Sequence, residues 1–207
     1  MGSRSNRAPL RGPAAALRAQ LAEEAARLIV ENGIEDFGLA KRKAAERLGV
    51  AGAGALPSNA QIHASVSERQ RIFEPAMHDR RLMKLRRLAA EVMELLEPFR
   101  PRLVGAVLLG TATINSSVEL HVFADAPESV AAMLERDGIA LRDCQRRFRF
   151  GGQRGGQFPG FAFARQGERV EVITFPERGA HEPPLSPVDR RPMRRAGLAA
   201  VLALLPA

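Results

Sequence analysis

The chain has 207 residues, of which 45% are hydrophobic, and its 31 Lys and Arg residues against 23 Asp and Glu residues give a formal net charge of +8. This length suits one medium domain with a helical extension or two small domains, and the apolar content is sufficient for a buried core. The apolar run near the C-terminus, Ala196–Ala207, is shorter than the roughly twenty residues that a membrane span needs, so we expect no membrane partner.

The N-terminus is basic, because Met1–Gln20 contains several arginines and no acidic residue. An organellar transit peptide has this composition, but so does a disordered basic leader, and we favour a leader that covers residues 1–13. No apolar segment of the kind that directs secretion follows it. Cys144 is the only cysteine, which indicates a reducing compartment, and we expect a cytoplasmic protein.

The first half of the chain has helical periodicity. Apolar residues recur at helical spacing over residues 14–31, and Asn32–Gly33 is a typical C-terminal stop. A short helix is expected over 41–48 and a longer one over 58–74, with an Ala/Gly-rich loop between them. These segments define a helical region over residues 14–78.

The second half changes to strand-like patterns after a further helix over 79–97. Apolar and polar residues alternate over 118–122, which is typical of a strand with one buried face. We therefore expect an α+β fold, in which residues 79–178 form a small mixed or antiparallel sheet with flanking helices and 179–207 form a Pro-rich loop and a C-terminal helix. The other expected elements are strands over 103–109, 139–150, 161–165 and 170–175 and helices over 127–136 and 193–205.

One segment carries a recognisable order of features. A short apolar strand ends at Gly110–Thr111, a loop follows, and the next strand carries Ser117–Glu119; a later strand carries Glu171. This order resembles that of the nucleotidyltransferase superfamily, which has the DNA polymerase beta-like fold. In that family a strand ends in Gly-Ser, the next strand carries Asp-x-Asp, and a third Asp lies on a later neighbouring strand.

The resemblance implies a metal-dependent transfer of a nucleotidyl group from a nucleoside triphosphate to an RNA, protein or small-molecule acceptor. Two divalent metals, Mg²⁺ or Mn²⁺, would hold the triphosphate and lower the pKa of the attacking hydroxyl. Glu119 and Glu171 match the catalytic, metal-binding acids. His121, on the same strand face as Ser117 and Glu119, could ligate a metal or contact phosphate, although a histidine on a strand face is more often polar surface. Gly110 and Thr111 match the turn that approaches the phosphates.

The sequence departs from the family pattern at the first acid, where Ser117 replaces Asp. Losing one carboxylate removes a full negative charge from a site that must hold divalent cations, so any metal should bind weakly. We expect Ser117 to be solvent-accessible and Val118 to face the core. Two functions stay open: a catalytically degenerate scaffold that binds nucleotide or RNA phosphates, and an active nucleotidyltransferase. The sequence leaves the oligomeric state open.

A basic stretch over residues 141–169 interleaves Arg with Phe. Arg147 and Arg149 could grip phosphates there while Phe side chains stack on bases. The alternative, which strand alternation favours, places the Phe residues in the core and the Arg residues on the solvent face of an antiparallel pair. The overall positive charge attracts phosphates, although Ala/Arg-rich composition also reflects a GC-rich genome.

Overall fold

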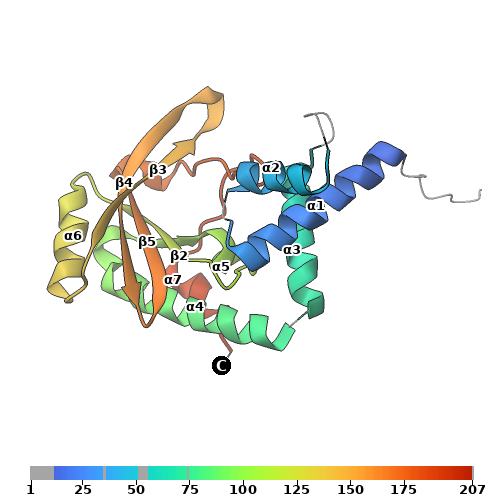
Figure 1. Ribbon diagram of the computed structural model, residues 1–207. Coiled ribbons are helices and arrows are strands. Elements are labelled where there is room, and N and C mark those ends of the chain that lie inside the picture. Colours follow the sequence, from blue (N-terminus) through green and yellow to red (C-terminus); the bar gives the residue numbers. More distant parts are fainter. Residues whose placement is uncertain (1–11, 35, 51–55, 74, 207) are drawn as a thin grey trace, which may run out of the picture. The chain divides into compact units, whose positions relative to one another are not determined.

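A computed structural model describes residues 12–34, 36–50, 56–73 and 75–206 (Figure 1). The chain divides into two compact units, Met1–Val66 and Ser67–Ala207. The predicted leader falls almost wholly outside the described residues, and Pro13 already begins the first helix. None of the helices in the described ranges is long and apolar enough to cross a membrane.

The first unit is helical, as the periodicity predicts. Helix α1 spans Pro13–Asn32 and ends where Gly33 adopts a left-handed conformation with φ 67°. Helix α2 spans Phe37–Arg47 and begins at Asp36, whose side chain accepts a hydrogen bond from the Leu39 backbone N–H. Helix α3, Asn59–Phe73, begins in this unit. The three helices bury a common apolar core that includes Leu21, Ala25, Leu28, Ala40, Ala44 and Ile62.

The second unit is built on a five-stranded mixed sheet with the strand order β1-β2-β5-β4-β3. Only the β2–β5 pair is parallel, and the three other pairs are antiparallel. The α+β prediction is thereby confirmed. The strands are β1 (Arg102–Val104), β2 (Val118–Phe123), β3 (Arg142–Arg149), β4 (Gly155–Arg165) and β5 (Glu168–Phe175), and the helices are α4 (Pro75–Leu95), α5 (Gly105–Leu109), α6 (Pro127–Arg136) and α7 (Leu198–Leu202).

The two faces of this sheet are covered differently. One face, here called the helix face, packs Val118, Leu120 and Val172 against α4, α6 and α7 in the main core. The opposite face, here called the aromatic face, carries a smaller cluster that includes Phe123 and Phe175. Because successive strand residues point to opposite faces, the odd-numbered residues of β2 and β5 belong to the aromatic face.

Several predicted boundaries shift. Residues 103–109 do not form one strand: β1 ends at Val104 and α5 begins at Gly105, where a φ of 69° turns the chain. A short apolar run suits a buried strand and a buried helix equally well, so periodicity alone could not separate them. Short 3-10 helices follow β3 and β5, the latter, η4, at Glu177–Ala180. The expected C-terminal helix over 193–205 contracts to α7.

Candidate functional site

The two acids singled out in the sequence lie side by side. Glu119 on β2 and Glu171 on β5 are register partners in the parallel pair, and both point to the aromatic face. Neighbouring strands are about 4.8 Å apart, so the two side chains leave the sheet together. The structure therefore brings Glu119 and Glu171 to one place.

Glu171 is neutralised by two arginines. Arg146 on β3 reaches across β4 and donates to the Glu171 Oε2 atom from both Nε at 3.0 Å and Nη2 at 2.6 Å. Arg169 donates from Nη2 to the Oε1 atom at 2.9 Å. The Glu171 residue is only 6% exposed. Both carboxylate oxygens of Glu171 therefore accept charge-assisted hydrogen bonds from arginines.

Glu119 is half-buried and packs against the turn that follows β1. A Cβ atom on Gly105 would lie 3.0 Å from the carboxyl carbon of Glu119, and Gly105 has φ 69°. Gly105 is thus the strand-ending glycine that adjoins the acidic strand. Gly110 instead caps α5 with φ 78°, and its carbonyl oxygen lies 3.0 Å from the Nε2 atom of His78.

Thr111, the second residue of the expected phosphate turn, is also held within the fold. Its side chain is buried, and its carbonyl accepts a 3.2 Å hydrogen bond from the Gln70 amide. The Thr111 backbone N–H donates to the Ala106 carbonyl at 2.9 Å. Gly110 and Thr111 are therefore placed one helix away from the acids, at the far end of α5.

Ser117 does not have the expected accessibility, because it is only 3% exposed. Continuing the β2–β5 register by one residue places Ser117 beside Arg169. Val118 is fully buried in the main core, which confirms the predicted strand register. A carboxylate introduced at position 117 would therefore be buried beside the Arg169 guanidinium.

His121 is a buried, neutral member of the aromatic cluster. Its ring centroid lies 4.6 Å from that of Phe175 and 5.2 Å from that of Phe148. Burial, and then the nearby charge of Arg195, lower the pKa of His121 to about 3. Arg195 Nε donates to the Nδ1 atom at 3.3 Å, which occupies the lone pair that a metal would need there.

Arg147 and Arg149 are on the other side of the sheet. Because Arg146 shares a face with Glu171, strand alternation directs Arg147 and Arg149 to the helix-face side of β3, where both are exposed. Phe148, between them, is half-buried against the aromatic cluster. The alternation interpretation of this Arg/Phe stretch is confirmed for these residues, and the structure does not bring the two arginines to the acids.

The side chains present do not fit a pair of Mg²⁺ or Mn²⁺ ions. Such ions need several carboxylate oxygens that are not already bound to cations. Both Glu171 oxygens bind arginines, Ser117 supplies no charge, and His121 is oriented by Arg195. Within the described ranges, no three His, Cys, Asp or Glu residues form a group that could hold a metal ion.

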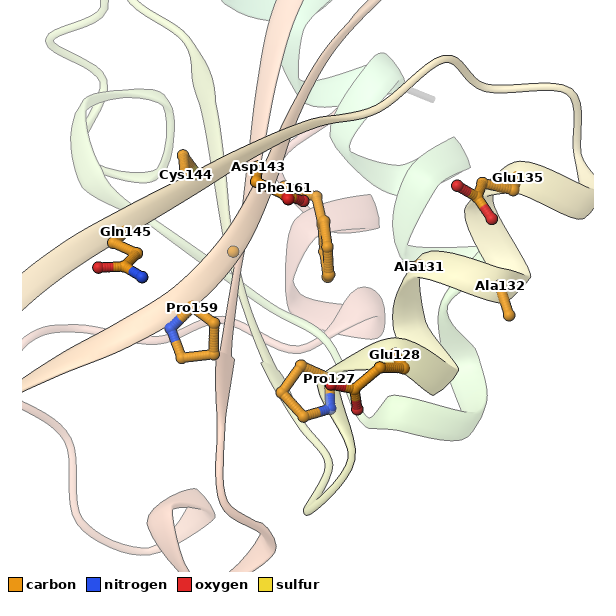
Figure 2. A pocket seen from close by; sticks show the side chains of 11 residues that line it. Pro127, Glu128, Ala131, Ala132, Glu135, Asp143, Cys144, Gln145, Pro159 and Phe161 are labelled. Atoms are coloured by element: carbon orange, nitrogen blue, oxygen red, sulfur yellow. The ribbon is translucent and has the colours of Figure 1, made fainter.

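A separate groove lies between α6 and strands β3 and β4 and has a volume of about 810 Å³. Figure 2 shows Glu128 and Glu135 on α6 facing it, with Asp143 and Phe161 contributed by the strands. Three carboxylates around an apolar floor disfavour a phosphate ligand. Neither Glu119 nor Glu171 lines this groove.

The sequence did not reveal the side chains that bind Glu171 and His121. Arg146 and Arg169 donate to Glu171, and Arg195 donates to His121. Nor did it reveal that Gly105 forms the close turn against Glu119. Strand alternation places Arg146 and Arg147 on opposite faces, but only the register of β3, β4 and β5 shows that Arg146 shares the face of Glu171. Searches found no family model, curated protein or solved structure that matches the chain.

Proposed function

We propose that this chain is a nucleotidyltransferase-like protein that has lost metal-dependent transfer and binds the phosphates of RNA or nucleotides through its arginines. The observation that carries the proposal is the engagement of Glu171, the counterpart of the family's third acid, by Arg146 and Arg169. Two fixed guanidinium groups supply positive charge where the family uses divalent cations. The single cysteine is compatible with the cytoplasm as its location.

The strand arrangement supports the scaffold part of the proposal. The order is a short strand, a glycine turn at Gly105, the short helix α5, a loop and the acidic strand β2, and the turn packs on Glu119. The later acidic strand β5 lies parallel to β2 with Glu171 in register. These are the relationships that a two-carboxylate site on neighbouring strands requires, so the loss of catalysis would follow from substitutions within a retained framework.

Exposed arginines on the edge strand β3 support phosphate binding. Arg142, Arg147 and Arg149 are exposed, and in the described parts of the chain no carboxylate forms an ion pair with them. Figure 1 shows β3 and β4 extending as a two-stranded ribbon beyond the rest of the sheet. Positive groups that are not neutralised by the protein are available to the phosphates of a polyanion.

The aromatic residues indicate which part of the nucleic acid is contacted. The chain has no Trp and no Tyr, and each Phe whose side chain is described is buried or half-buried. Base stacking needs an exposed ring or a guanidinium plane. We therefore expect contacts to be mainly with phosphates, with little base preference and strong salt dependence.

The test compares RNA binding by the wild-type chain with that of the double variant Arg147→Gln/Arg149→Gln. The matched control is Arg80→Gln/Arg87→Gln, which removes two exposed arginines from α4. We expect the β3 variant to weaken binding of single-stranded RNA at least several-fold and the control to weaken it less. Equal loss in both variants, or no binding at low salt, would contradict the assigned surface.

A separate assay tests whether the protein has lost metal-dependent nucleotidyl transfer. A radiolabelled nucleoside triphosphate is incubated with the protein, Mg²⁺ or Mn²⁺, and a panel of RNA, protein and small-molecule acceptors. We expect no transfer of label. Transfer that requires the metal and disappears in Glu119→Gln and Glu171→Gln would instead establish the active enzyme.

A further inference from the structure

Arg195 is half-buried, and the hydrogen-bond acceptors of its guanidinium in the described residues are uncharged groups. Its Nη1 donates to the carbonyl of Gly179 at 2.9 Å, and its Nε donates to His121. The guanidinium carbon lies 5.1 Å and 5.2 Å from the ring centroids of Phe123 and Phe175. The Nη2 atom is buried and has no hydrogen-bond partner, and in the described residues no acid forms an ion pair with Arg195. A donor left in this state is costly, so its retention needs an explanation.

A second arginine lies close to the first. Arg102 on β1 is the register partner of His121 and points to the same aromatic face. Its Nη1 atom lies against Gly197, where a Cβ would come within 2.7 Å, and donates a long hydrogen bond of 3.5 Å to the Pro101 carbonyl. Burial, and then the charge of Arg102, lower the pKa of Arg195 to about 10. Two guanidinium groups are therefore gathered beside a neutral histidine.

The chemistry of this cluster selects an anion. Both arginines have N–H donors to spare, and no carboxylate in the described chain neutralises either of them. Guanidinium groups donate paired hydrogen bonds to phosphate oxygens, and two of them balance the charge of a phosphate dianion. A carboxylate ligand would carry half that charge and would leave the pair of guanidinium groups with a net positive charge.

We propose that Arg102 and Arg195 form a binding site for a single phosphate group on the aromatic face, between β1 and the segment that carries Arg195. The ligand is inorganic phosphate or the phosphate of a nucleotide. Since Arg195 Nη2 lies beneath the surface, a rotation of its guanidinium toward the phosphate accompanies binding. This site uses none of the arginines assigned to RNA, so it goes beyond the proposed function and can fail or hold independently of it.

The experiment measures the melting temperature of the wild-type chain while inorganic phosphate, ATP or sodium chloride is added, with the three series compared at equal ionic strength. We expect phosphate, ATP or both to raise the melting temperature saturably by several degrees, whereas chloride does not. A response to ATP without one to phosphate would assign the site to a nucleotide.

Two variants and one control locate the effect. Arg195→Met and Arg102→Met should each abolish the ligand-dependent rise, whereas Arg87→Gln, at an exposed position on α4, should retain it. The readout is the increment on adding ligand, because removal of an unpaired buried cation could itself raise the starting melting temperature. No ligand-dependent rise in the wild type, or a rise that persists in both Met variants, would overturn the proposal; loss of RNA binding in the β3 variant would have no bearing on it.

Discussion

Arg146 donates two hydrogen bonds to a single oxygen of Glu171, from Nε at 3.0 Å and from Nη2 at 2.6 Å, although the two residues lie on strands separated by β4. On the intervening strand, Gly160 packs closely on β5, because a Cβ there would lie 2.6 Å from the Ile173 side chain and 2.5 Å from the Val172 carbonyl. Glu171 is therefore paired with an arginine of the same chain. The proposed loss of metal-dependent transfer rests on this pairing.

Removing this arginine should destabilise the fold measurably. Arg146→Gln leaves Glu171, which is 6% exposed, with Arg169 as its remaining charged partner, and we expect the free energy of unfolding to fall by about 1–3 kcal/mol. Urea denaturation measures the change. The control is Arg147→Gln at the adjacent exposed position, which should stay within about 0.5 kcal/mol of wild type. Equal effects of the two substitutions would show that the Arg146–Glu171 pair contributes nothing to stability.

Restoring the missing acid should not restore a metal site. Ser117→Asp places a carboxylate at a buried position next to Arg169, while both Glu171 oxygens remain bound to arginines. We expect this variant to melt below the Ser117→Ala control and to gain no Mn²⁺-dependent rise in melting temperature. A saturable rise with Mn²⁺ would show that the arginines yield the site to a metal.

The neighbouring position tests the strand register. Val118 is fully buried in the main core, so Val118→Asp introduces an unpaired charge into an apolar environment and should prevent folding. Circular dichroism distinguishes the folded and unfolded chains. A folded Val118→Asp protein would mean that position 118 faces solvent and that β2 has the opposite register.

His121 should make the fold sensitive to acid. Its pKa is about 3 in the folded protein against 6.5 when unperturbed, because burial and the charge of Arg195 disfavour the imidazolium. Between these values the unfolded chain binds a proton that the folded chain does not, so stability is complete above pH 6.5 and falls as the pH decreases. The contribution is about 1.4 kcal/mol per pH unit.

A substitution isolates this contribution. His121→Gln keeps a hydrogen-bond acceptor for Arg195 but cannot titrate, so its unfolding free energy should depend less steeply on pH between about 4 and 6. The matched control, His181→Gln, changes an exposed histidine of the same unit. The assignment fails if His121→Gln keeps the full wild-type slope, which would place the acid sensitivity in other groups.

Gly105 should resist substitution for two separable reasons. Its φ of 69° disfavours any side chain, and a Cβ there would lie 3.0 Å from the Glu119 carboxyl carbon. Gly138 has φ 75°, but a Cβ there would meet no atom within 4 Å, so Gly138→Ala measures the conformational cost alone. We expect Gly105→Ala to lose about 1–3 kcal/mol and to exceed the control. Equal losses would mean that Glu119 moves away without cost.

The sequence predicted the relationships that depend on alternation along one strand. The alternation over 118–122 placed Val118 in the core. Only the resemblance to a known family implied that the two acidic strands are neighbours, and the structure pairs them. The sequence could not predict the partner of Glu171, because Arg146 reaches it only through the registers of two further strand pairs. The division of the apolar run at Gly105 was also hidden, since strand and helix bury such a run equally well.

We infer that exposed arginines of β3, rather than metal ions, hold phosphates on this scaffold. Fluorescence anisotropy of labelled single-stranded RNA tests this most directly, first in EDTA, Mg²⁺ and Mn²⁺ at matched ionic strength and then over a series of salt concentrations. The predicted result is the same Kd within about twofold in all three, and a log–log dependence on salt with a slope near −2, as about three phosphate contacts would give. Binding that requires Mg²⁺ or Mn²⁺, or that does not change with salt, would contradict the account.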